Sequence, residues 1–369
     1  MQKKQFPAVR AFARVDTAAL ASNFGLLAAR AAGARVIAVV KANAYGHGVS
    51  LAVPPLLAAG CRDFAVATLG EALAVRALAP DAMVLILGYT PPDRADLLAA
   101  ADITQTVFSL DYARALAARG RRIAVHIKID GGMCRLGFSP RDTRGVLAAL
   151  RAAPLVPTGI YTHFPVADTD PRATRKALTA FLTLRGTLAA RGYPLFAHAA
   201  ASAALLTLSE VALDGVRVGL SLYGLPPVST DLSLTPVLSL HAPVVQIHRV
   251  PTGTPVGYGG DFITRRPSRI GTLPVGYADG FVRAMQGFAL SLTCGKKSYP
   301  LFPAGRICMD QMTVDLTDTP ARVGDTVTLW QDARAPAAHL GTIPYEILAM
   351  LSPRVTRIAQ ARVNHPNPP

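Results

Sequence analysis

Short runs of β-branched residues alternate with Ala- and Leu-rich stretches through the first 235 residues, and this alternation constrains the fold most. It predicts eight strands, at 35–41, 63–68, 83–88, 103–109, 122–130, 157–164, 194–199 and 215–221. It also predicts a helix between each pair of strands, among them 69–79, 91–101, 111–119, 140–153 and 171–191. Strand–helix alternation favours a parallel sheet, and eight units in about two hundred residues fit a closed (β/α)₈ TIM-type barrel.

The alternative is an open, doubly wound sheet. Such a sheet usually carries a glycine fingerprint of the form G-x-G-x-x-G, which this sequence lacks. The barrel is therefore the fold that we expect for the first part of the chain.

The character of the sequence changes after about residue 235. Pro, Gly and Thr become more frequent, and short β-like runs are separated by turn signals. The fold class is therefore α/β, a TIM-type barrel followed by a mostly β C-terminal domain. We assign residues 11–235 to the barrel, and residues 236–369 together with 1–10 to the β domain.

The charge of the chain is strongly positive. It has 38 Lys and Arg against 23 Asp and Glu, a formal net charge of +15. Such a charge suggests a nucleic-acid partner, but the basic residues are scattered and no basic tract contains interleaved aromatic residues. An anionic small ligand explains the charge as well, so we expect no nucleic-acid partner.

Targeting signals and cysteine motifs are missing from the sequence. Lys3, Lys4, Arg10 and Arg14 leave no room for an apolar signal core, and no apolar run is long enough to span a membrane. The four cysteines form no Cys-x-x-Cys motif, which suits a reducing compartment. We expect a cytoplasmic protein with no membrane partner and no metal site.

Lys41 follows five apolar residues at the end of the first predicted strand. An ammonium group at the end of a buried strand is costly unless it is paired, neutral or covalently used. Taken alone, Lys41 could equally be a solvent-facing lysine at a loop entrance. Its meaning depends on what the other strands carry at the same end.

Polar residues recur at the carboxyl ends of these strands, where the chemistry of such barrels takes place. They are Lys41, Lys128, Asp130, Arg135, His163, His198, Ser202 and Arg217. Each has an ordinary explanation, such as an ion pair between Arg217 and Asp214, but their joint placement is harder to explain that way. Ser202 and Gly219 follow the last two strands, a usual phosphate position. A lysine, a phosphate site and an arginine facing one cavity predict pyridoxal phosphate.

Distinctive motifs occur along the chain at 39–48, 126–137, 162–164, 217–224, 256–259, 276–280, 305–310 and 345–347. In their order and spacing, these motifs resemble those of the alanine racemase family. The resemblance implies a homodimer whose two active sites each take residues from both subunits. It implies interconversion of L-alanine and D-alanine, with pyridoxal 5'-phosphate bound to Lys41 as a Schiff base, and D-alanine supply for peptidoglycan. Lys41 and the Tyr258 of the second subunit are then the catalytic bases on opposite faces of the substrate α-carbon.

The resemblance also assigns the binding residues. Those that bind the cofactor are Lys41, Tyr45, His163, Ser202, Arg217, Gly219, Leu220 and Tyr345. Those that bind the substrate or line its entrance are Arg135, Met309, Asp310 and Tyr277. Lys128 matches a lysine that is often carbamylated, whose new carboxylate holds Arg135. Arg217 faces the pyridine nitrogen and, because an arginine keeps its proton, leaves that nitrogen unprotonated.

The chain departs from the family pattern at three positions. Gly131 replaces a threonine, Ala201 an asparagine and Gly257 a serine, and none of these changes removes a catalytic group. Three other functions share parts of the pattern: a broader racemase of serine or basic amino acids, a non-catalytic pyridoxal-phosphate-binding protein, and a decarboxylase. The β domain with Tyr258 argues against a carrier built on one barrel, and the decarboxylase requires a longer chain.

Overall fold

The computed structural model describes residues 10–360, apart from the side chain of Ser209, and these residues form two compact units. The barrel unit comprises Ala18–Ala44 and Ala52–Thr235. The β unit comprises, among the described residues, 10–17, 45–51 and 236–360. Residues 1–9, with the basic start of the chain, and 361–369 were both expected in the β domain but lie outside the described residues.

Eight parallel strands close the barrel in the order β2-β3-β4-β5-β6-β7-β8-β9. Their bounds are β2 Arg35–Val39, β3 Asp63–Val66, β4 Met83–Ile86, β5 Thr104–Val107, β6 Ala124–Lys128, β7 Val156–Tyr161, β8 Phe196–His198 and β9 Gly215–Val218. The barrel closes where β9 pairs with β2, for example Val216 with Val36. The eight predicted strands and the closed barrel are confirmed, and the open sheet is excluded.

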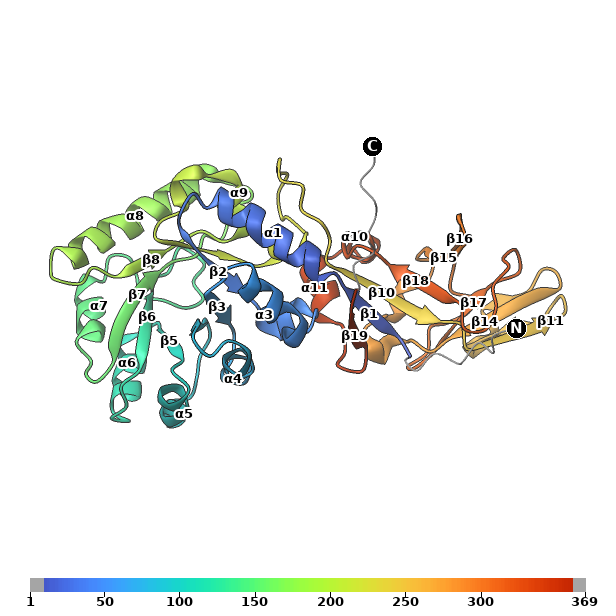
Figure 1. Cartoon of the computed structure of the whole chain (residues 1–369), viewed down its shortest axis with the longest axis horizontal. Helices are drawn as coiled ribbons and strands as arrows, with labels where there is room; N and C mark the ends of the chain where they lie inside the picture. The colour runs from blue at the N-terminus through green and yellow to red at the C-terminus, as the bar shows by residue number, and fades with distance from the viewer. Residues whose placement is uncertain (1–9, 361–369) are drawn as a thin grey trace. The chain divides into compact units, whose positions relative to one another are not determined.

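Helices follow most of the strands, and Figure 1 shows α4 to α8 in succession around the outside of the barrel. The helices are α1 Thr17–Arg30, α3 Val49–Ala58, α4 Leu69–Leu78, α5 Ala95–Ala100, α6 Leu110–Ala117, α7 Thr143–Leu150, α8 Pro171–Ala189 and α9 Ser202–Thr207. Short 3₁₀ turns are η1 Pro92–Arg94, η2 Ser209–Val211 and η3 Leu220–Tyr223. The side chains of Thr68, Ser109, Asp142 and Asp170 cap four of these helices and fix where they begin. Within residues 10–360, no helix combines the length and apolar character that a membrane crossing requires.

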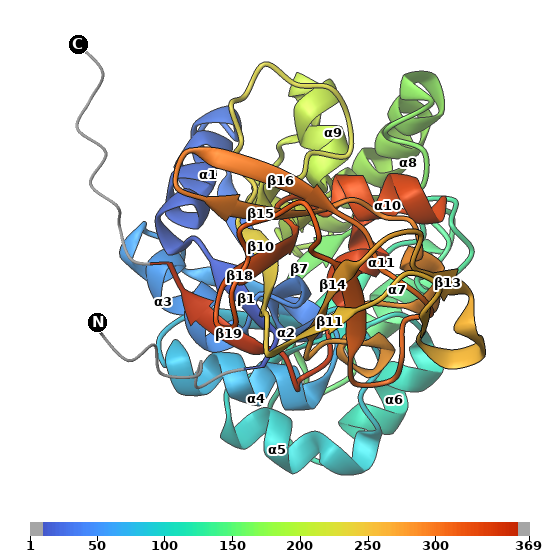
Figure 2. The same cartoon turned by 90° about the vertical axis from the view of Figure 1, so that its right-hand side faces the viewer.

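The described residues of the β unit form three sheets. One has six strands in the order β16-β15-β18-β10-β1-β19, visible in Figure 2; another has the order β11-β14-β17, and β12 pairs with β13. The strands of the large sheet are β1 Phe12–Val15, β10 Leu238–Pro243, β15 Leu290–Cys294, β16 Lys297–Leu301, β18 Thr326–Trp330 and β19 Thr356–Ala359. The others are β11 Gln246–Val250, β12 Pro255–Val256, β13 Phe262–Ile263, β14 Ser268–Leu273 and β17 Met312–Asp315. The helical segments are α10 Arg334–Leu340, α11 Pro344–Ala349, η4 Tyr258–Gly260, η5 Tyr277–Asp279 and η6 Arg283–Met285.

The start of the barrel differs from the expected boundary at residue 11. Strand β1 pairs antiparallel with β10 and parallel with β19, so residues 12–15 belong to the large sheet of the β unit. Residues 45–51 also belong to that unit. The alternating pattern of 10–15 predicts a half-exposed strand but does not specify which strands pair with it.

Candidate active site

Arg217 lies in β9 and is 4% exposed. Its NH1 donates to His198 Nδ1 at 2.6 Å and to the His198 carbonyl at 2.9 Å, while NH2 donates to the carbonyls of Thr162 at 2.6 Å and Ala199 at 2.9 Å. Burial lowers the pKa of Arg217 to about 10, so the guanidinium stays charged near neutral pH. These four bonds use both terminal nitrogens, which leaves the Nε–H without a partner among the described residues.

Two buried histidines continue this network below Arg217. Because Arg217 donates to His198 Nδ1, a neutral His198 carries its proton on Nε2 and donates to His126 Nδ1 at 2.9 Å. Burial, with Arg35 and Arg217 close by, lowers the pKa of His126 to about 3, and burial also holds the pKa of His198 well below its usual range. The two rings are therefore neutral, and the hydrogen bonds run in one direction: Arg217 donates to His198, and His198 donates to His126.

Tyr161 and Lys128 also lie close to the guanidinium. The Arg217 Cζ lies 5.0 Å from the Tyr161 ring centroid and the Lys128 Nζ lies 5.2 Å from it, while His198 stacks on the same ring. Lys128 is buried, and its Nζ donates to the Ile129 carbonyl at 2.7 Å. Burial first, and then the charges of Arg217 and Arg135, lower the pKa of Lys128 to about 7. A large fraction of this amine is therefore neutral near neutral pH.

Lys41 follows β2 at the beginning of a left-handed turn. Ala42, Asn43 and Ala44 have φ values of 52°, 53° and 55°, and Tyr45 has a φ of 51°. Left-handed backbone is unfavourable for residues with a Cβ and persists only where the surroundings enforce it. One such restraint is Glu71, whose carboxylate accepts from the Ala42 N–H at 2.7 Å and from the Ala67 N–H at 2.8 Å.

Burial lowers the pKa of Lys41, and the nearby Arg135 lowers it further, whereas Glu71 raises it. Arg135 itself is exposed and makes no hydrogen bond or ion pair within residues 10–360. Four basic residues, Lys41, Lys128, Arg135 and Arg217, thus lie in one region, where the acidic groups that act on the two lysines are Glu71 and Asp130. This charge balance favours an anionic ligand.

His163 follows β7 in the same region. Burial lowers its pKa to about 3, and the charges of Arg217, Lys128, Arg135 and Lys41 contribute to this shift. His163 is therefore a neutral ring under the influence of these four basic residues. The structure brings the five residues into one region.

Small groups at the ends of β8 and β9 provide donors for an anion. Ser202 begins α9, and its Oγ accepts from the Gly219 N–H at 3.2 Å, so its own hydroxyl proton remains available. Gly219 precedes η3, which begins at Leu220. The Ser221 Oγ is buried without a hydrogen-bond partner among the described residues.

The loop that carries Arg135 is folded around Asp130. The carboxylate of Asp130 accepts from the backbone N–H groups of Gly132, Met133 and Cys134 at 3.1–3.3 Å. A Cβ at Gly131 would lie 2.1 Å from the His163 carbonyl oxygen. The glycine that replaces the usual threonine thus permits close contact between this loop and the end of β7.

In the β unit, Tyr45 and Tyr345 lie together. Their ring centroids are 6.0 Å apart, and Tyr345 is in the first turn of α11. Burial raises the pKa of Tyr45, so this hydroxyl stays protonated. Both hydroxyl-bearing rings that the resemblance assigns to cofactor binding therefore come from this unit.

Tyr258 is 71% exposed and makes no hydrogen bond among residues 10–360. It lies between Gly257, with φ 73° and ψ −174°, and Gly259, with φ 77°. The first conformation is essentially restricted to glycine, so the serine of the family pattern does not suit Gly257 here. A pocket of about 400 Å³ next to this turn is lined by Asp261, Phe262, Arg283, Gln286, Gly305, Arg306 and Ile307.

Tyr277 and Met309 lie on adjoining turns, where the Tyr277 N–H donates to the Cys308 carbonyl and the Ala278 N–H to the Met309 carbonyl. Both side chains are exposed, Met309 by 52%. Asp310 was expected on the substrate side, but its carboxylate is engaged by Arg354 at 2.6 Å. The structure brings these turns together, and within residues 10–360 the Tyr258 side chain makes no hydrogen bond to either of them.

Sequence reasoning missed three residues that shape these sites. Glu71 was recognisable from the Thr68-x-x-Glu71 capping pattern, and the structure contains that capping box. Tyr161 and Arg354 gave no local signal, because their partners are distant in sequence. No cluster of metal-binding side chains occurs within residues 10–360.

Comparison with known proteins supplies independent information. The chain matches the family model "Alanine racemase, N-terminal domain" over residues 15–227 and "Alanine racemase, C-terminal domain" over 237–359. The alanine racemase of Clostridium novyi is 37% identical over an alignment of 371 positions, gaps included, that covers 94% of each protein. The crystal structure of alanine racemase from Bacillus anthracis with bound L-Ala-P has a TM-score of 0.88 and 33% identity, covering 96% of each chain. Alanine racemase from Bartonella henselae with covalently bound pyridoxal phosphate has a TM-score of 0.83 and 30% identity, covering 96% of this chain and 100% of that one.

Proposed function

Because this chain belongs to the alanine racemase family, we propose that it interconverts L-alanine and D-alanine with Lys41 and Tyr258 as the two bases. The observation that supports this proposal best is the set of Lys41, Arg217, Ser202 and Gly219 at the carboxyl ends of the barrel strands. The D-alanine formed in this way would serve peptidoglycan synthesis.

The barrel residues fit pyridoxal phosphate. The free Nε–H of Arg217 suits a pyridine nitrogen that accepts a hydrogen bond, and the Ser202 hydroxyl and the turn at Gly219–Leu220 suit its phosphate. Lys41 supplies the amine that binds the aldehyde, and the family resemblance also assigns Tyr45 and Tyr345 to cofactor binding. When bound, pyridoxal phosphate supplies an electron sink that makes the α-hydrogen of an amino acid acidic.

Lys41 is suited to receive that hydrogen on one face of the substrate. Its pKa is lowered, so a larger fraction of the amine is neutral than for an exposed lysine. Arg135 has no partner in the described protein and can bind the substrate carboxylate. Lys128, with its pKa of about 7, is suited to carbamylation: the neutral amine adds CO₂, releases a proton and becomes a carboxylate that holds Arg135.

Tyr258 serves the opposite face. Racemisation requires proton exchange on both faces of one carbon, and therefore two groups that flank it. Tyr258 is 71% exposed and its hydroxyl makes no hydrogen bond within residues 10–360, so it lacks the surroundings of a finished site in its own chain. We propose that it completes the site of a second subunit in a homodimer, together with Tyr277, Met309 and Asp310.

Incubation with single amino acids followed by chiral chromatography tests the proposal. L-Alanine should approach equal amounts of its two enantiomers, because these have equal free energies. L-Serine, L-lysine and L-arginine should react more slowly, and faster conversion of any of them would indicate the broader racemase. If no D-isomer forms from any substrate while the cofactor is bound, the protein is a carrier and the proposal is wrong. Growth of a D-alanine auxotroph that expresses this chain tests the peptidoglycan role.

A further inference from the structure

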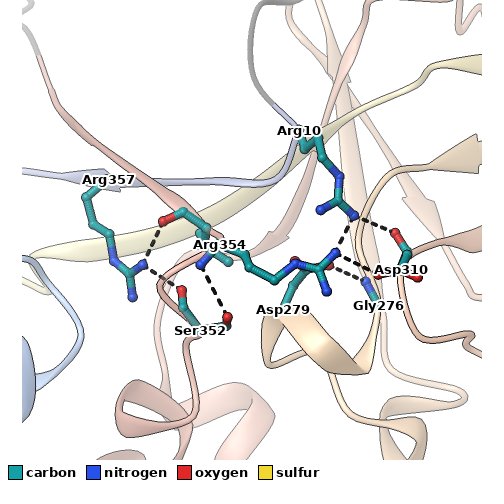
Figure 3. Close-up of polar contacts among 8 residues, drawn as sticks. Arg10, Gly276, Asp279, Asp310, Ser352, Arg354 and Arg357 are labelled. Atoms are coloured by element: carbon teal, nitrogen blue, oxygen red, sulfur yellow. Dashed lines mark hydrogen bonds and ion pairs between the residues drawn. The ribbon is translucent and has the colours of Figure 1, made fainter.

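Four charged side chains form a compact cluster in the β unit, at the turns that carry Tyr277 and Met309 (Figure 3). Arg354 spans two carboxylates, with Nε 3.4 Å from Asp279 Oδ1 and NH2 2.6 Å from Asp310 Oδ1. Arg10 makes a parallel connection, with NH2 3.5 Å from Asp279 Oδ2 and 2.9 Å from the Asp310 carbonyl oxygen. Each arginine thus connects Asp279 with Asp310.

Asp279 is the buried centre of this cluster. Its side chain is only 2% exposed, and its Oδ2 accepts from the Gly276 N–H at 3.0 Å, which closes the 3₁₀ turn that carries Tyr277. Its backbone carbonyl accepts from the Ser352 N–H, next to the loop that carries Arg354. A buried carboxylate requires compensating charge, and Arg10 and Arg354 supply it.

The two turns approach each other too closely to be adjusted independently. Tyr277 and Ala278 donate to the carbonyls of Cys308 and Met309 at 3.1 and 3.0 Å. A Cβ at Gly276 would lie 2.2 Å from the Cys308 carbonyl oxygen. The side chains of Tyr277 and Met309 are exposed, so they do not anchor the turns in the core of the unit. The hydrogen bonds and the four-residue cluster connect one turn to the other.

We propose that Arg354, assisted by Arg10, is a positioning residue that fixes the Met309–Asp310 turn against the Tyr277 turn. This inference rests on the proposed function, in which these turns complete the substrate site of a second subunit. Arg354 does not contact the substrate; it occupies the Asp310 carboxylate and sets where Met309 and Tyr277 are presented. Asp310 therefore acts through its ion pair rather than as a free carboxylate.

Arg354→Met in the cofactor-loaded protein tests this assignment by hydrogen exchange and by kinetics. Exchange of the Tyr277 and Ala278 amides should accelerate about tenfold, because the turns open more often. The KM for alanine should rise about tenfold while kcat stays within about twofold. Arg354→Lys should recover only part of both effects, because one ammonium cannot span Asp279 and Asp310 as the guanidinium does. Arg266→Met, which removes the surface pair with Asp318 in the same unit, is the matched control.

Each outcome is decisive. If amide exchange is the same in Arg354→Met and in Arg266→Met, Arg354 does not fix the two turns against each other and the proposal is wrong. Faster exchange with an unchanged KM, or a fall in kcat alone, overturns the positioning role. If the native protein racemises no amino acid but amide exchange still accelerates in Arg354→Met, Arg354 does fix the two turns and the proposed function is wrong. Asp310→Asn in the Arg354→Met background should add little to the KM, and full additivity contradicts an action of Arg354 through Asp310.

Discussion

The two units present their site residues in opposite ways. In the barrel unit, Arg217 is 4% exposed and its two terminal nitrogens donate four hydrogen bonds to neighbouring groups. In the β unit, Tyr258 is 71% exposed and Met309 is 52% exposed, and Tyr258 lacks a hydrogen-bond partner within residues 10–360. The barrel residues are held in place by their own chain, whereas the β-unit residues lack the surroundings that a catalytic group needs.

The backbone shows the same contrast. Lys41 leads into four consecutive left-handed residues that have a Cβ, and each of these other than Asn43 costs roughly 1–2 kcal/mol. The Tyr258 turn instead places glycine at its positive φ values, at Gly257, Gly259 and Gly260, and so avoids this cost. The backbone after Lys41 is therefore strained and depends on its surroundings, whereas the glycine-rich turn at Tyr258 is not strained. One half of the proposed site is therefore preorganised by its own chain, whereas the other half is the part that we propose a second subunit completes.

The largest expected effect comes from Lys41→Ala, which removes the preorganised half. Both the covalent attachment and one base disappear, so racemisation should fall by more than about 10⁴-fold. The visible absorbance of the bound cofactor should also be lost from the purified protein. Lys176→Ala changes an exposed lysine on α8 and should leave both properties intact. A retained absorbance band in Lys41→Ala would mean that another residue binds the cofactor.

Tyr258→Phe addresses the exposed half and should reduce racemisation by about 10²–10⁴-fold with the cofactor still bound. Co-expression with Lys41→Ala distinguishes the source of the tyrosine. Random pairing makes half of the dimers mixed, and each mixed dimer contains one site with both residues intact, so about a quarter of the native activity should return. If Tyr258 serves its own chain, every site in the mixture lacks one base. An inactive mixture would therefore contradict the shared site.

The sequence predicted the barrel half better than the β half. Strand–helix alternation placed Lys41, His163 and Arg217 at one end of the barrel, because the carboxyl ends of parallel strands meet there. Alternation does not report long-range pairing, so the strand at 12–15 was assigned to the barrel although it pairs with β10 and β19. Arg354 was missed for the same reason: its two carboxylates are distant in sequence. The left-handed turn after Lys41 was also not predicted, because only Asn43 among its residues favours that conformation.

Acid should destabilise the barrel through its buried histidines. The pKa of His126 is about 3 in the folded protein, against about 6.5 for an unfolded chain. Between these values the unfolded state binds the additional proton, so stability is full above about pH 6.5 and falls as the pH decreases, by up to about 1.4 kcal/mol per pH unit. His126→Asn keeps an acceptor for His198 but does not titrate. Urea unfolding from pH 8 to pH 4 should therefore show a shallower decline for this variant, and an unchanged slope would rule out His126 as a source.

The smallest effect concerns Ala201, where the barrel half lacks a group that the family pattern contains. Ala201 occupies the N-cap of α9 with extended backbone, φ −105° and ψ −174°, and makes no side-chain cap. Ala201→Asn should supply that cap and stabilise the protein without cofactor by about 1 kcal/mol in urea unfolding. Ala333 is the matched position in the β unit: it precedes α10, also without a side-chain cap, but its φ of −64° and ψ of −12° are helical. Because a cap requires extended backbone, Ala333→Asn should add no stability. Equal gains at the two positions would show that the effect of Ala201→Asn does not come from capping, and hence that local geometry does not distinguish the two units here.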